Sequence, residues 1–148
     1  MGTRLAQLLL GFALASAGVV AEAQAGGALP AKGTNLWMTV GERRFAITLA
    51  DTAAARAFAE RLPLTLDMED LNANEKHVSL TKPLPVSSLR PGTIRNGDLM
   101  LYGTNTFVVF YVTFESAYSY TRIGRVQDPA SLAQALGSGS VRVKFSRE

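Results

Sequence analysis

The residues of this sequence with the clearest capacity for chemistry are its tyrosines. All four of them, Tyr102, Tyr111, Tyr118 and Tyr120, lie between positions 102 and 120. A tyrosine joins a large apolar ring to a hydroxyl group that donates or accepts a hydrogen bond, which suits it to lining a ligand site. The cluster predicts a groove that binds a small molecule or an extended peptide without forming a covalent bond.

The apolar run at 107–114 is expected to form a strand, in which alternate side chains point to opposite faces. The even-numbered residues 108, 110, 112 and 114 are all apolar and are expected to face the interior. Phe107 and Tyr111 would then lie on the outer face. Two interpretations stay open for that face: the floor of a groove, or a second apolar layer covered by a helix or by the proline-rich excursion.

Arg122 shares a face with Tyr120 if the surrounding strand is regular. Its guanidinium group could bind a carboxylate or a carbonyl, or it could stack on Tyr120 at the surface. Asn105 is expected near the rim of the groove. The complete set of predicted ligand-binding residues is Tyr102, Asn105, Phe107, Tyr111, Tyr120 and Arg122.

The densest acidic stretch contains Asp67, Glu69, Asp70, Glu75 and His77. It could form a divalent-cation loop or a carboxylate–histidine acid–base pair, or it could be a solvated loop. The spacing matches no calcium loop, so the solvated loop is favoured and no metal site is expected.

Several kinds of site are excluded by composition. With no cysteine and one histidine, the chain has no disulfide, no thiolate ligand and no multi-histidine metal centre. It also lacks the glycine-rich motifs that bind nucleotide phosphates, so no cofactor is expected. The net charge is +3, from 15 Lys and Arg against 12 Asp and Glu. The basic residues are scattered, so a nucleic acid is not expected as a partner.

The N-terminus has the features of a secretory signal peptide. Arg4 precedes an apolar run from Leu5 to Val20, and Ala23 to Ala25 offers a cleavage site after Ala25. The alternative, a membrane anchor, would have a short span. We therefore expect a signal peptide at 1–25, a flexible leader at 26–34, a domain at 35–148, and a periplasmic or secreted protein with no membrane contact after cleavage.

The rest of the chain predicts a mainly β fold. Strands are expected at 35–40, 43–49, 64–68, 76–80, 98–102, 107–114, 118–126 and 140–145, and helices at 53–62 and 130–136. Residues 69–75 are expected to form a loop, and the proline-rich stretch 81–92 an irregular excursion. This order favours a closed β-barrel of about eight strands with two short capping helices.

Three segments carry a family resemblance: Thr93–Gly103, Phe107–Tyr111 and Ser119–Val126. They resemble the small bacterial cyclophilin-like family, whose members largely lack an assigned activity. The resemblance implies a cyclophilin-like barrel, in agreement with the strand count, and says little about function.

True cyclophilins share part of this pattern. Their turn before the last helix is similar to Ile123–Val126, and one of their strands is similar to Val108–Val112, which puts Tyr111 at a position that lines the proline pocket. Their Phe-His-Arg motif has no counterpart here, and Trp37 occurs too early to match their tryptophan. The alternative function is therefore a peptidyl-prolyl isomerase with a non-standard site. A third hypothesis is a structural domain in which the tyrosines form an interface. The oligomeric state stays open.

Overall fold

The described part of the chain is residues 36–148, which we analyse in a computed structural model. The predicted signal peptide and leader lie outside the described residues. Within them, no helix is long and apolar enough to cross a membrane.

Ten strands and two helices follow one another along the described chain: β1 (Leu36–Val40), β2 (Arg43–Leu49), α2 (Ala53–Glu60), β3 (Leu64–Leu71), β4 (Glu75–Ser79), β5 (Gly92–Ile94), β6 (Asp98–Tyr102), β7 (Thr106–Phe110), β8 (Phe114–Ser116), β9 (Thr121–Val126), α3 (Leu132–Leu136) and β10 (Val141–Arg147).

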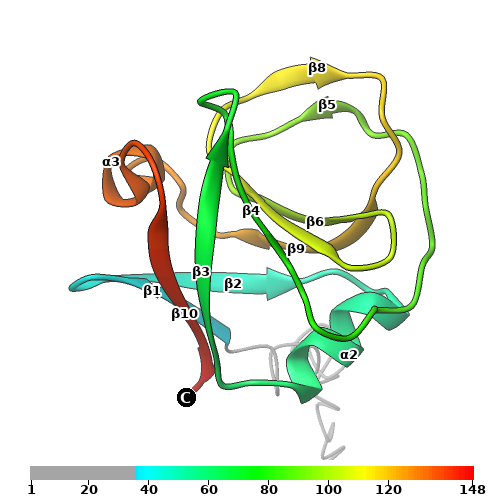
Figure 1. Ribbon diagram of the computed structural model, residues 1–148, viewed down its shortest axis with the longest axis horizontal. Coiled ribbons are helices and arrows are strands. Elements are labelled where there is room, and N and C mark those ends of the chain that lie inside the picture. The colour runs from blue at the N-terminus through cyan, green and yellow to red at the C-terminus, as the bar shows by residue number, and fades with distance from the viewer. Residues whose placement is uncertain (1–35) are drawn as a thin grey trace, which may run out of the picture.

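Eight of these strands close into one antiparallel barrel (Figure 1). Their order around the barrel is β1-β10-β3-β4-β7-β6-β9-β2, and β2 pairs with β1 to complete the ring. Closure leaves no barrel strand with an unpaired edge. The predicted fold class, a closed β-barrel of about eight strands with two short helices, is confirmed.

The two helices lie in the connections from β2 to β3 and from β9 to β10. At the start of α2, Thr52 Oγ1 accepts a hydrogen bond of 3.0 Å from the Ala55 N–H, which satisfies a helix N-terminal donor. Phe58 of α2 is buried and stacks on Phe107, with ring centroids 4.7 Å apart. The helix α3, between β9 and β10, buries Leu132 and Leu136 in the same core.

Strand β7 is buried on both faces, and the predicted facing of its residues was wrong. Phe107 and Val109 point into the barrel core, whereas Val108 and Phe110 belong to a second apolar cluster outside it. Period-two alternation assigns residues to two faces but does not say which is inside when both are apolar.

The second cluster exists because a small two-stranded sheet covers part of the barrel wall. The predicted strand 107–114 ends at Phe110, and Phe114–Ser116 then pairs with Gly92–Ile94 as the β5–β8 sheet. This sheet arches above β6 and β9 in Figure 1. The cluster beneath it contains Ile94, Met100, Val108, Phe110 and Tyr120, with Phe114 packed against it. A covered apolar layer is therefore present, but it contains Val108 and Phe110 rather than the predicted Phe107 and Tyr111, and the β5–β8 sheet is its cover.

The acidic stretch forms a hairpin, so the predicted loop at 69–75 was too long. Strand β3 continues to Leu71, and β4 begins at Glu75. In the turn, the Asn74 N–H donates to the Leu71 carbonyl, and both Asn72 and Ala73 have positive φ angles. Asparagine tolerates this left-handed conformation well, which suits residue 72 to the turn.

Candidate ligand-binding groove and its supporting ion pair

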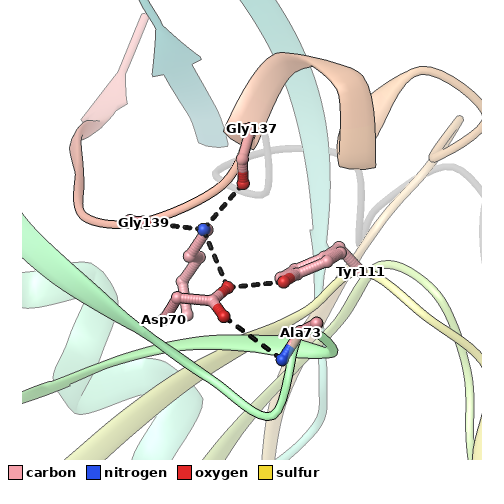
Figure 2. Close-up of polar contacts among 6 residues, drawn as sticks. Asp70, Ala73, Tyr111, Gly137 and Gly139 are labelled. Carbon is pink, nitrogen blue, oxygen red and sulfur yellow. Dashed lines mark hydrogen bonds and ion pairs between the residues drawn. The ribbon is translucent and has the colours of Figure 1, made fainter.

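The side chain of Lys76 is fully buried at the start of β4, yet all three of its ammonium hydrogens have acceptors. Its Nζ lies 2.9 Å from Asp70 Oδ1, 2.8 Å from the Gly137 carbonyl and 2.7 Å from the Gly139 carbonyl. Figure 2 shows these contacts joining β3, β4 and the loop between α3 and β10. A buried charge with no solvent contact is tolerated only when it is paired and hydrogen-bonded in this way.

Asp70 is the centre of the same network. Its Oδ1 also accepts a hydrogen bond from the Tyr111 hydroxyl, and its Oδ2 accepts one of 3.2 Å from the Ala73 N–H (Figure 2). The bond from Tyr111, followed by that from Lys76, lowers the pKa of Asp70 below its ordinary value. Burial and the hydrogen bond to Asp70 raise the pKa of Tyr111 to about 12. Asp70 is therefore held ionised and Tyr111 protonated at neutral pH.

This network fixes the direction of the neighbouring side chains. Because alternate residues of a strand face opposite sides, an inward Lys76 turns Glu75 and His77 to the outer face. There they pair in register with Phe110 and Val108 of β7.

On that outer face lies a hollow of about 270 Å³, between the β3–β4 turn and the segment that leads from β8 to β9. Its floor is formed by β4, β6 and β7. It is lined by Leu71, Asn72, Glu75, His77, Tyr102, Thr106, Val108, Tyr118 and Tyr120. A second hollow of about 160 Å³ shares Asn72, Glu75, Tyr118 and Tyr120 with it and extends along β8 to Phe114 and Glu115. We call the two together the tyrosine groove.

Three tyrosine rings contact one another in this groove. The centroids of Tyr102 and Tyr118 are 6.1 Å apart, with the ring planes at 84°, and those of Tyr102 and Tyr120 are 5.8 Å apart, with the planes at 55°. Tyr120 is anchored in the second apolar cluster. Tyr102 and Tyr118 are 47% and 64% exposed, so their rings are available to a ligand.

Glu75 is the partly buried carboxylate of the groove. Burial, with a further contribution from the negative charge of Asp70, raises its pKa above the ordinary value. Burial is also the main cause that raises the pKa of Tyr120. Close by, Asn74 Oδ1 is buried and has no hydrogen-bond donor. The groove therefore combines aromatic surface with oxygen acceptors.

The structure brings together only part of the predicted ligand-binding set. Tyr102 and Tyr120 line the groove, joined by Tyr118 from the same tyrosine cluster. Phe107 is fully buried in the barrel core, and Tyr111 is committed to Asp70. Both point inward because the facing of β7 is opposite to the one predicted, so neither lines the groove.

Asn105 and Arg122 also lie outside the lining. The Asn105 amide donates to the Leu80 carbonyl at 3.3 Å, which ties the turn before β7 to the start of the proline-rich excursion. The Arg122 carbonyl accepts a 2.7 Å hydrogen bond from Thr52 Oγ1, beside the start of α2. These hydrogen bonds are made by the Asn105 side chain and by the Arg122 backbone, and both lie within the fold.

The acidic stretch does not converge on one point. Asp67 pairs with Arg142 across β3 and β10, at 2.8 Å, while Asp70 turns toward Lys76. Within residues 36–148 no group of three or more side chains could hold a metal ion. Two members of the stretch, Glu75 and His77, line the hollow together with the tyrosines. Strand alternation could have placed Glu75 and His77 on one face, opposite Lys76. Assigning that face to the outside required knowing that Lys76 is buried.

The sequence profile of the Cyclophilin-like family matches residues 38–146, which is most of the chain. The chain belongs to this family. Among solved structures it is similar to the solution structure of a hypothetical protein from Archaeoglobus fulgidus, at 15% sequence identity and a TM-score of 0.49, over 76% of this chain and 93% of that one. No curated protein matches the sequence. Family membership thus agrees with the closed barrel described above, and it assigns no activity.

Replacing Lys76 by methionine should lower the free energy of unfolding by about 3 kcal/mol, because it leaves a carboxylate and two carbonyls without their buried partner. Urea denaturation measures the change. The matched control is Arg142→Met, which breaks an exposed cross-strand pair and should leave stability almost unchanged. Equal effects of the two substitutions would contradict a special role for Lys76.

The contribution of Asp70 to stability should depend on pH with a definite sign. Because folding lowers its pKa, the contribution is complete above the ordinary value of 3.8 and is lost as the pH falls through the folded-state pKa. The difference in unfolding free energy between wild type and Asp70→Asn should therefore be constant near neutral pH and shrink in acid. A difference that stays constant in acid would contradict the assignment.

Proposed function

We propose that this Cyclophilin-like protein binds a small molecule or a segment of extended peptide, non-covalently, in the tyrosine groove. The observation that carries the proposal is the convergence of Tyr102, Tyr118 and Tyr120 on one hollow. Tyrosine rings bind apolar groups at low conformational cost, and their hydroxyls orient the ligand.

The shape and surroundings of the hollow support this function. Val108 and Leu71 add apolar surface, while Thr106 and Asn72 add hydrogen-bonding groups at the edges. A concave site with an apolar floor and a few polar groups is the usual form of a ligand pocket. The N-terminal sequence supports a second part of the proposal, that the domain acts in the periplasm or outside the cell.

An isomerase function is the less favoured alternative. The comparison with cyclophilins gives no counterpart of their arginine, and no arginine is among the residues that line the tyrosine groove within the described chain. Tyr111, which the resemblance placed at the proline pocket, points to Asp70 instead. A groove of this kind can desolvate an X–Pro amide, but it lacks a cation to stabilise the rotating bond.

Ligand binding can be tested by NMR titration of residues 26–148 with blocked tetrapeptides and a panel of small fragments. We expect chemical-shift changes to concentrate on Tyr102, Tyr118 and Tyr120. Tyr118→Ala should weaken binding of the best probe about tenfold, because it removes one aromatic wall. The control is Val86→Ala, another exposed apolar side chain. Shift changes confined to other surfaces would refute the groove as the site.

A protease-coupled assay with a proline-containing tetrapeptide tests the alternative. We expect no acceleration of cis–trans isomerisation by the folded protein, since the groove offers no arginine. Acceleration that Tyr118→Ala abolishes would establish an isomerase. Self-association that the same substitution disrupts would favour the structural-interface hypothesis instead.

A further inference from the structure

The charge of the tyrosine groove is opposite in sign to that of the chain. The whole sequence carries a net charge of +3, yet the groove is lined by two carboxylates, Glu75 and Glu115, and by neither lysine nor arginine. Glu115 accepts a 2.6 Å hydrogen bond from the Thr93 hydroxyl. Among the described residues, no ion pair within 4.0 Å involves either carboxylate.

The neighbouring lysine, Lys76, does not neutralise the carboxylates of the groove. The Lys76 ammonium is on the inner face of β4, where Asp70 and the two glycine carbonyls occupy all its donors. Asp70 contributes a further negative charge, which is one of the causes that raise the pKa of Glu75. A positively charged group beside Glu75 would therefore stabilise its ionised carboxylate.

The aromatic walls favour the same kind of ligand. The tyrosines make edge-on and tilted contacts with one another, and the exposure of Tyr102 and Tyr118 leaves ring surface open to the hollow. The face of an aromatic ring attracts a cation, and several such rings around one space form the usual cage for an alkylated ammonium group.

A third observation is the missing hydrogen-bond donor. Asn74, which lines the part of the groove beside β8, has a buried Oδ1 without a partner. Buried acceptors are nearly always satisfied, so this oxygen can accept a hydrogen bond from a donor in the hollow, on a ligand or on a water molecule. Ammonium and guanidinium groups bring donors and no acceptor.

We propose that the tyrosine groove recognises an organic cation, an alkylammonium or guanidinium group held between the tyrosine rings and Glu75. This inference rests on the proposed function and adds the class of ligand to it. An anion would meet two carboxylates, and a neutral ligand would leave Glu75 without a counter-charge in a partly buried site. The cation could belong to a free amine or to a lysine or arginine side chain of an extended peptide.

The test uses two matched pairs of probes in NMR and calorimetric titrations with residues 26–148. The first pair is choline and the neutral alcohol in which carbon replaces its nitrogen. The second is a blocked lysine-containing tripeptide and the same peptide with the lysine acetylated. The first pair keeps the shape and removes the charge, and the second removes the charge by adding an acetyl group. We expect the cationic member to bind at least about tenfold more tightly than the neutral one, with shift changes at the groove tyrosines.

Two variants locate the effect. Glu75→Gln keeps the size of the side chain and removes its charge, and should weaken cation binding about tenfold without affecting the neutral probes. Glu42→Gln neutralises an exposed carboxylate in the turn between β1 and β2 and should have no effect. Preference for choline or for the lysine peptide tells whether the groove favours a free alkylated ammonium ion or the cation of a side chain.

Other outcomes separate this inference from the proposed function. If neutral and cationic probes bind the groove equally, or if Glu75→Gln leaves cation affinity unchanged, the cation inference is wrong and ligand binding by the groove stands. If none of the probes, charged or neutral, changes the groove resonances while the protein is folded, both are contradicted.

Discussion

The candidate site depends on the hydrogen bonds and the ion pair made by the buried ammonium group of Lys76. This group has no contact with solvent, so its charge must be met by Asp70 and by two carbonyls of the loop that follows α3. Satisfying it binds the β3–β4 hairpin, the end of β7 through Tyr111, and the start of β10 into one unit. The hydrogen bonds of the buried Lys76 ammonium consequently fix the geometry of the tip of the β3–β4 hairpin.

The groove is a consequence of that unit on the other side of the sheet. An inward Lys76 directs Glu75 and His77 outward, and the turn that follows Asp70 brings Asn72 and Asn74 to the edge of the hollow. The opposite wall comes from the chain between β8 and β9. It is held in place by the apolar cluster under the β5–β8 sheet, in which Tyr120 is buried. A structural ion pair that does not line the groove, and a small second core that contributes Val108 and Tyr120 to its lining, thus shape this surface together.

Membership of the Cyclophilin-like family accounts for the barrel. The chemistry of the site depends on particular residues. A fold supports many functions, and function is argued from the site. In this member of the Cyclophilin-like family, the hollow over β4, β6 and β7 is lined by three tyrosines and by Glu75. The arrangement is suited to holding a ligand through ring faces and oxygen acceptors.

The sequence by itself determined the architecture, because strand periodicity, turn residues and helix caps are local signals. The strands predicted at 35–40 and 43–49, the helix that begins at residue 53 and the closed barrel followed from them. Three of the four clustered tyrosines, Tyr102, Tyr118 and Tyr120, line one hollow. Only the tertiary structure decided which face of β7 is inside, since both faces are apolar and a second sheet of distant residues covers one. It also decided that Lys76 is buried, because pairing with Asp70 and the loop after α3 depends on contacts between remote parts of the chain.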